Sequence, residues 1–246
     1  MKNILFVNFS MNEATCDLSK YSVERNLNCD YIELDEEIPF FEKMNLFIDK
    51  CVNMEYDYFL RSDADRIIFP GIRDLMDHAM THPSGMVYEG TGYEYIMNRR
   101  RNATPHIYTK SCLEHFSENN IRTLDVLKPE STLTNNIAEK FVSLKTKNIT
   151  NIHEYGLTKN RVFNCFLQRI KRNHFKYYDI EYIKNNLPLH YFEAICDAVE
   201  YYNNNMLEDQ KNFVYVLDTD GEREEKTMQE LKCEYDNLVR KYYEAK

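Results

Sequence analysis

Residues 58–71 read YFLRSDADRIIFPG. An apolar run leads to Asp63 and Asp65, which stand one residue apart, and a second apolar run follows them as far as Pro70. Burying a bare pair of carboxylates is strongly unfavourable, so these acids need a cation, hydrogen-bond donors or water beside them. The stretch predicts a buried strand, an acidic turn at its end, and a helix introduced by the proline.

The segments around this stretch alternate between two hydrophobic periods. Short apolar runs indicate strands, and apolar residues at i, i+3, i+4 and i+7 indicate helices. Strands that alternate with helices are typical of an α/β fold, in which a mostly parallel sheet carries helices on both faces. The predicted strands are residues 3–8, 31–34, 57–60 and 86–88, and the predicted helices are residues 44–52 and 72–80.

The two acids follow the predicted strand at 57–60 almost directly. In a parallel α/β sheet, ligands bind beyond the carboxyl ends of the strands, so we expect Asp63 and Asp65 at a cleft on this edge. The competing interpretation is structural. In that case Asp65 caps the following helix, or pairs with Arg61 or Arg66.

The composition excludes several classes of function. The chain has 246 residues and a 43% hydrophobic fraction, which suits one large α/β domain with a sizeable core. Its formal net charge of −9 disfavours nucleic acid as a partner, because phosphate backbones select basic surfaces. A local basic patch could still hold a small anionic ligand.

Cysteine usage and hydropathy indicate the compartment. The seven cysteines are scattered and include no C-x-x-C pair, which is typical of reduced thiols in the cytosol. No apolar stretch approaches the roughly 20 residues that span a bilayer, and the N-terminus lacks the features of a signal peptide. We therefore expect a cytoplasmic protein without a transmembrane segment.

The chain has a predicted helix, then YDYFLRSDAD, then RIIFPG. This order resembles the centre of GT-A glycosyltransferases, which are nucleotide-sugar-dependent enzymes with a DXD motif. Family-two members are the nearest comparison. The resemblance covers residues 1–170 as an order of elements and residues 40–80 more closely. It implies a Rossmann-like GT-A fold, with a catalytic domain over residues 1–175 and a mainly helical extension over 176–246 packed on it. The apolar stripe of the last helix, from Met228 to Tyr242, would pack on this domain or join two subunits.

The resemblance also implies a metal site. Asp63 and Asp65 would hold Mn²⁺ or Mg²⁺ against the diphosphate of a nucleoside-diphosphate sugar, with UDP as the default nucleotide. His153, well after the DXD, would complete the site, and Lys159 in the basic helix behind it would neutralise phosphate. An ordinary solvated helix with a loop histidine is the alternative for this second segment.

The same resemblance implies which residues would bind the nucleotide of the sugar donor and what the sugar acceptor would be. Asn8 and Asp35, at the ends of the first two strands, would contact the nucleotide, and Lys43 and Arg61 are candidates for its ribose or phosphates. Asn8-Phe9-Ser10-Met11 stands where family-two enzymes carry Pro-x-x-Asn, so the nucleotide stays open. The acceptor would be a hydroxyl of a glycan, a lipid-linked sugar or a protein.

An inverting transferase needs a carboxylate to take the proton of the acceptor hydroxyl. Glu130 in the segment Lys128–Leu133 matches the family position, although Ser131 stands where an aspartate is usual. Asp125 and Glu94 are the alternatives, and Glu130 could instead be favoured there by a helix N-terminus. Inversion is preferred, but a retaining mechanism would need no such base.

Two other functions fit the same pattern. A sugar nucleotidyltransferase also uses paired acids and a metal, but it should carry a glycine-rich, lysine-bearing loop after the first strand, and residues 8–19 contain no glycine. A non-catalytic module that binds a sugar or a partner would use Asp63 and Asp65 structurally.

Overall fold

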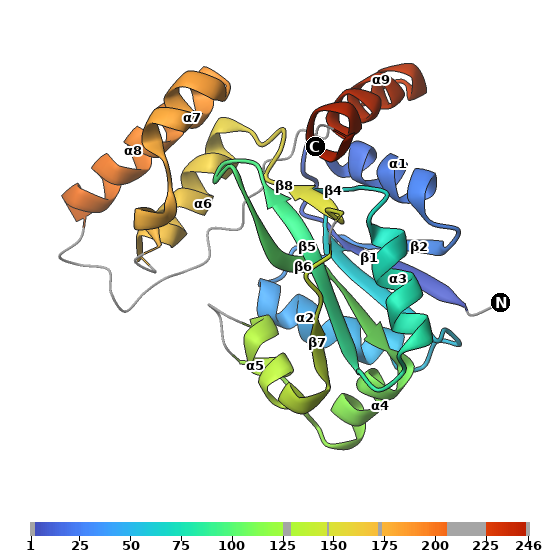
Figure 1. Ribbon diagram of the computed structural model, residues 1–246. Helices are drawn as coiled ribbons and strands as arrows, with labels where there is room; N and C mark the ends of the chain where they lie inside the picture. The colour runs from blue at the N-terminus through green and yellow to red at the C-terminus, as the bar shows by residue number, and fades with distance from the viewer. Residues whose placement is uncertain (1–2, 125–128, 147, 172–173, 206–224, 245–246) are drawn as a thin grey trace.

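A mixed β-sheet with helices on both faces forms the centre of the protein (Figure 1). The computed structural model describes residues 3–124, 129–146, 148–171, 174–205 and 225–244. Within these residues the strand order is β2-β1-β3-β6-β5-β8-β4, and β7 pairs with β5. The predicted α/β architecture is confirmed.

The parallel half of the sheet consists of β1 (Ile4–Phe9), β2 (Asp30–Leu34) and β3 (Tyr58–Asp63). β1 lies between the other two and is apolar on both faces, which is the pattern of a central strand covered on both sides. Leu5, Val7 and Phe9 pack into the core on one face, and Phe6 packs on the other.

The other half of the sheet makes it mixed. β6 (Arg99–Thr109) runs antiparallel to both β3 and β5 (Val87–Glu94). Beyond β5, the short strands β8 (Asn151–His153) and β7 (Phe141–Ser143) are parallel to it, and β4 (Arg66–Ile68) is antiparallel to β8. The sequence did not predict β6, because its first three residues, Arg99, Arg100 and Arg101, have the composition of a solvated loop.

Helices cover both faces of the central strands. α2 (Phe40–Cys51), α4 (Lys110–Glu118) and α5 (Pro129–Asn135) share one core cluster with β1 and β3. On the opposite face, α3 (Ile72–Thr81) and the end of α1 (Cys16–Asn26) share another. α2 and α3 begin and end within a few residues of the predicted helices, and their predicted apolar stripes are the faces they bury.

The C-terminal helices gather at the β4–β8 end of the sheet (Figure 1). α6 (Lys159–Lys171), α7 (Ile180–Asn186) and α8 (Leu189–Asn205) share a core cluster with these strands, and α9 (Met228–Leu238) packs on α1. Short helical turns lie at Ala138–Lys140, Phe175–Tyr177 and Val239–Glu244. Helices α7, α8 and α9 thus share a core cluster with β4 and β8, while the predicted division of the chain near residue 175 stays a prediction.

The apolar stripe of α9 is used within the chain. Leu231, Tyr235 and Leu238 are buried, and Asn26 of α1 donates a hydrogen bond to the Tyr235 hydroxyl at 2.5 Å. The stripe thus packs within the chain, the first of its two predicted uses, and a role in joining subunits stays a prediction. None of the helices in the described ranges has the length and apolarity to cross a bilayer.

Candidate functional site

The acidic turn lies at the carboxyl ends of β1 and β3, as predicted. In the parallel register Asn8 is paired with Ser62, and Phe9 is paired with Asp63, so β3 runs three residues further than the sequence indicated. The Ala64 N–H donates to the Phe9 carbonyl at 2.9 Å, and the Thr15 hydroxyl donates to the Ala64 carbonyl at 2.8 Å. These bonds hold the turn against the start of α1.

Asp63 is bound by two arginines. Its Oδ1 accepts from Arg61 Nη2 at 2.6 Å, and its Oδ2 lies 3.4 Å from Arg66 Nε. Arg61 is completely buried beneath the rings of Phe9 and Phe40, while the Asp63 side chain is 24% exposed. Asp63 therefore forms the ion pairs with Arg61 and Arg66 that the structural interpretation assigned to Asp65.

Asp65 has a different environment. Its Oδ2 lies 3.4 Å from His153 Nε2 and 4.0 Å from Arg161 Nη2, and Oδ1 has no hydrogen-bond partner among the described residues. The carboxylate is almost fully buried. α3 is capped at Gly71 without a side-chain bond, so Asp65 is not its cap.

The sheet register brings His153 to this place from the end of β8. There it pairs with Arg66 of β4 on one side and with Glu94 of β5 on the other. The His153 ring joins two carboxylates, because Nδ1 lies 2.8 Å from Glu94 Oε2 while Nε2 faces Asp65. His153 thus lies beside Asp65 and is carried by a strand rather than a loop, while its role as a metal ligand stays a prediction.

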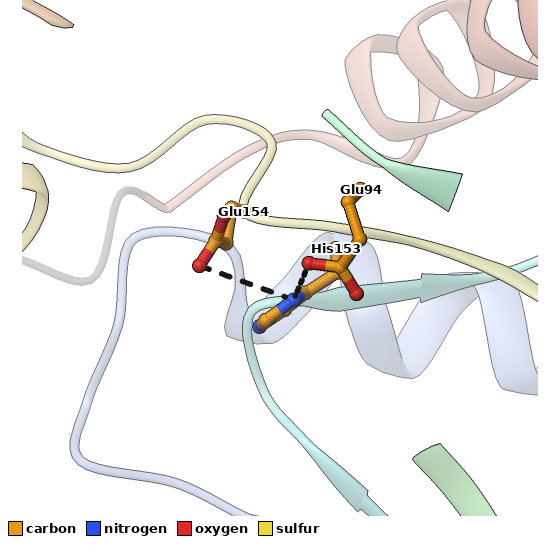
Figure 2. A group of neighbouring side chains, drawn as sticks. All are labelled: Glu94, His153 and Glu154. Carbon is orange, nitrogen blue, oxygen red and sulfur yellow. Dashed lines mark hydrogen bonds and ion pairs between the residues drawn. The ribbon is translucent and has the colours of Figure 1, made fainter. Parts of the chain in front are cut away.

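A third carboxylate, Glu154, follows His153 in a left-handed backbone conformation with φ 65°. Its Oε1 is 4.0 Å from His153 Nδ1 (Figure 2). Arg169 of α6 forms an ion pair with Glu154, and Arg101 Nε lies 2.9 Å from Glu94 Oε1. Each of these two glutamates thus has its own arginine.

Two acids of this cluster, Asp65 and Glu94, favour the ionised form. Burial opposes ionisation at Asp65, but the charge and hydrogen bond of His153 outweigh it and hold the pKa of Asp65 below its usual range. The pKa of Glu94 is also lowered, since His153 and Arg66 overcome the desolvation of its carboxyl. The cluster therefore offers carboxylates, the form that binds a cation.

The cluster fits a divalent metal at one point. Asp65 Oδ1 is a buried carboxylate oxygen without a hydrogen-bond partner in the described chain, and it shares its side chain with the oxygen that faces His153 Nε2. Carboxylate oxygen suits Mg²⁺ and Mn²⁺, and imidazole nitrogen is a ligand for transition metals. At Asp63, by contrast, a cation would compete with two arginines.

The predicted base Glu130 is carried by α5, on the face of the sheet that α2 and α4 also cover. It forms ion pairs with Arg61 and with His106, whose Nδ1 is 3.4 Å away. Burial raises the pKa of Glu130, but Arg61 and His106 lower it by more, so the carboxylate is a weak proton acceptor in this arrangement. Asp125 lies outside the described residues. Glu94 is completely buried between His153 and Arg101, which leaves no approach for an acceptor hydroxyl.

The residues predicted to contact the nucleotide have different environments. Asn8 is completely buried at the end of β1, and neither polar atom of its side chain has a hydrogen-bond partner within the described chain. Lys43 reaches the same edge from α2 and donates to the Ser10 carbonyl at 2.7 Å; burial lowers its pKa, and Glu13 partly offsets this. Asp35 is exposed just after β2.

Lys159 does not reach the acids. Its ammonium lies 3.0 Å from Asp197 and 3.5 Å from Glu193, both on α8. The cation that α6 places beside Asp65 is Arg161, which also lies 4.0 Å from Glu13. The expected basic helix is therefore present, with a different side chain directed at the site.

Sequence reasoning missed the partners of the predicted residues. His106, Arg101 and Arg169 became visible only when β6 and α6 were placed beside the acids. The strand alternation of β6, which puts Arg99 and Arg101 on one face, was the available signal for Arg101.

Comparisons with known proteins show only distant structural similarity. No protein-family model matches the chain, and no curated protein matches its sequence. Among solved structures, A197 from STIV is 14% identical over 58% of this chain and 82% of its own, with a TM-score of 0.46. A glycosyltransferase involved in glycosylation of the PBCV-1 major capsid is 13% identical over 62% and 94%, with a TM-score of 0.44.

A third solved structure is similar at the same level. CMP:2-keto-3-deoxy-manno-octonic acid synthetase, solved with CTP, is 9% identical over 71% of this chain and 100% of its own, with a TM-score of 0.44. Likeness at this level identifies no family and assigns no activity. The function is therefore argued from the site.

Proposed function

We propose that this protein is a metal-dependent glycosyltransferase, which moves a sugar from a nucleoside-diphosphate sugar to a hydroxyl acceptor. The observation that carries the proposal is the Asp65–His153 pair, a buried carboxylate and an imidazole held together at the carboxyl ends of β1 and β3. That edge is where an open α/β sheet binds its ligands.

The residues around the pair suit a diphosphate leaving group. Asp65 and His153 would hold Mn²⁺ or Mg²⁺, which when bound supplies charge stabilisation for the departing diphosphate. Arg161 lies on the same side of the site and adds a fixed positive charge close to Asp65. Asn8 and Lys43, at the same strand ends, would bind the nucleotide, and UDP is the nucleotide we favour.

The acceptor chemistry is the less defined part of the proposal. Glu130 is held by Arg61 and His106, so it would act as a base only after these contacts loosen. We keep inversion as the preferred course, with a glycan, a lipid-linked sugar or a protein as the acceptor. The absence of glycine from residues 8–19 still speaks against a nucleotidyltransferase, which needs a phosphate-cradling loop there.

A donor panel tests the proposal. Purified protein is incubated with UDP-, GDP-, CMP- and dTDP-sugars with and without Mn²⁺, and released nucleotide and thermal shift are measured. We expect release and stabilisation with one donor class, only with metal, because a bound ligand stabilises the folded state by mass action. Asp65→Asn should abolish both effects, while Asp77→Asn, an exposed change on α3, should retain them.

Two outcomes would contradict the proposal. Turnover of a nucleoside triphosphate with a sugar phosphate, and none of a nucleotide sugar, would make the protein a nucleotidyltransferase. The complete absence of binding and turnover across the panel would leave the binding-module interpretation.

A further inference from the structure

We propose that Glu94 is the positioning residue of the metal site: it holds His153 so that Nε2, and not Nδ1, is presented to the cation beside Asp65. This inference rests on the proposed metal-dependent function and deepens it, because it names the atom that binds and the residue that sets it. Glu94 lies 59 residues from His153 in sequence, and the pairing of β5 with β8 brings the two together.

The roles of the two ring nitrogens follow from their partners. Glu94 is ion-paired with Arg101, and a carboxylate only accepts hydrogen bonds, so the 2.8 Å contact between Glu94 Oε2 and His153 Nδ1 uses a proton on Nδ1. Nε2 is then the nitrogen left for a cation, which would take the place of its proton. That nitrogen is the one that faces Asp65, at 3.4 Å from Oδ2.

Glu94 is well placed to fix the ring. Its side chain is completely buried, and Arg101 Nε lies 2.9 Å from Oε1, the oxygen that His153 does not use. Each of its two oxygens is thus directed by a separate partner, and β5 is paired with β8 at His153. A carboxylate that accepts from the second ring nitrogen orients a metal-binding histidine and raises its basicity.

A second arrangement of the same cluster must be distinguished from this one. Glu94, His153 Nδ1 and Glu154 offer three ligand atoms within 4.8 Å of one another, enough to suggest a cation between them (Figure 2). Glu154 Oε2, like Asp65 Oδ1, has no hydrogen-bond partner among the described residues.

Charge favours the Asp65 side. Glu94 and Glu154 are each neutralised by an arginine in direct contact, Arg101 and Arg169. A cation at Nδ1 would displace the hydrogen bond to Glu94 and approach both guanidinium groups. At Asp65 the Arg161 guanidinium lies 4.0 Å from Oδ2, beyond hydrogen-bond range, and Oδ1 has no hydrogen-bond partner among the described residues.

Metal affinity provides the first test, with Mn²⁺ alone as the probe. Isothermal titration and the EPR signal of free Mn²⁺ give the dissociation constant for wild type, Asp65→Asn, Glu94→Gln, Glu154→Gln and Glu89→Gln. Glu89 is the matched control, since it lies in the same strand and contacts another buried histidine, His106 at 3.4 Å. Circular dichroism checks that each variant is folded.

The expected pattern is specific. Asp65→Asn loses binding, Glu94→Gln weakens it about 10- to 100-fold, the range for second-sphere partners of metal-bound histidine, and Glu154→Gln and Glu89→Gln stay within about 3-fold of wild type. Wild-type affinity in Glu94→Gln would overturn the inference and leave the proposed function intact. Loss in Glu154→Gln with retention in Asp65→Asn would place the cation at Nδ1 and overturn it too.

A readout without metal separates positioning from simple structural support. Long-range ¹H–¹⁵N correlation spectra report whether Nδ1 of His153 carries a proton, with His153→Gln supplying the assignment. We expect Nδ1–H in wild type and in Glu89→Gln, and a lowered Nδ1–H population in Glu94→Gln, whose amide can also donate. A wild-type ring without a proton on Nδ1 would overturn the inference. If wild type binds no Mn²⁺ at all, the proposed function fails and this inference fails with it.

Discussion

Two aspartates one residue apart have different tasks in this protein. Asp63 still belongs to β3 and uses its carboxylate to pair with Arg61 and Arg66. Asp65 lies past the strand, in the turn, and faces His153. The sequence left open whether a cation or protein donors stabilise these acids, and each acid has its own answer. Asp63 is bound by protein donors, whereas Oδ1 of Asp65 has no hydrogen-bond partner among the described residues.

Burial changes one expectation about Asp65. A carboxylate in a solvent-filled cleft could be replaced with little effect on stability, and the sequence favoured that view. Asp65 is instead nearly fully buried beside His153 and Arg161, so its replacement removes the negative charge that these groups face. Binding studies on Asp65→Asn consequently need a temperature at which the variant is shown to be folded.

Glu130→Gln should lower stability at neutral pH by about 1–3 kcal/mol, because it removes a charged partner of the buried Arg61. The folded-state pKa of Glu130 lies below its ordinary value of 4.5, so the contribution of this carboxylate is fully present above that pH. It is lost as the pH falls through the folded-state pKa. Urea unfolding of wild type and variant from pH 7 to pH 3 measures the difference.

The difference in unfolding free energy should shrink as the pH falls below about 4.5. Glu139→Gln, a change on the exposed turn at Ala138–Lys140, is the control and should show little difference at either end of the range. A constant gap between wild type and Glu130→Gln down to pH 3 would contradict the ion pair.

At this scale the sequence indicated some contacts and missed others. His153 lies beside Asp65, as expected of a histidine near the DXD motif, and its role as a metal ligand stays a prediction. The partner of Glu130 could not be foreseen, because Arg61 lies 69 residues away and only the packing of α5 on β3 brings them together. Lys159 does not face the acids, for a related reason. The rotation of α6 about its axis decides which basic side chain points toward Asp65, and here it is Arg161.

Elements with strong hydrophobic periodicity were predicted well. β1, α2, β3 and α3 each have apolar residues that match one regular period, and their bounds are close to the predicted ones. β6 and β8 were missed, the first because it begins with three arginines, and the second because three residues cannot show a period. These two strands carry His106, Arg101 and His153, so much of the site depended on elements with no clear signal.

The junction of α3 with the segment before β8 depends on a glycine. A Cβ built on Gly71 would lie 2.3 Å from the Ile149 carbonyl oxygen, and backbone atoms cannot turn aside as a side chain can. Gly71→Ala should therefore destabilise the fold by about 3 kcal/mol, at the upper end of overpacking effects. Because β8 follows directly, metal binding through His153 should weaken as well.

Gly85→Ala is the comparison for this prediction. Its added Cβ would first meet side-chain atoms of Tyr88 and Val142, and not backbone near His153, so a smaller loss and unchanged metal affinity are expected. Thermal unfolding and Mn²⁺ titration of both variants provide the measurement. Equal stability of Gly71→Ala and wild type would show that α3 and the Ile149 backbone are further apart than described.

At the scale of the whole molecule, the charge distribution is uneven. The chain carries a formal net charge of −9, yet Arg66, Arg101, Arg161 and Arg169 lie around the acids at one edge of the sheet. The overall charge disfavours a polyanion such as nucleic acid. At the sheet edge each of these guanidinium groups lies beside a carboxylate, Asp63, Glu94, Asp65 or Glu154, so positive and negative charges alternate there.

The C-terminal region contributes to the same end of the molecule. α6 supplies Arg161 and Arg169 to the acid cluster, and α8 holds α6 in place, with Lys159 paired to two of its carboxylates. The helices after the sheet are thus part of the site. A shorter chain ending near residue 150 would lack His153 and both arginines.

The most direct measurement of the central claim is the anomalous scattering of manganese in crystals soaked with Mn²⁺ and UDP. The account predicts a peak at coordination distance from an Asp65 oxygen and His153 Nε2, with the nucleotide at the ends of β1 and β3. A fully occupied peak elsewhere, or no peak while Asp65 is bonded only to protein donors, would contradict it.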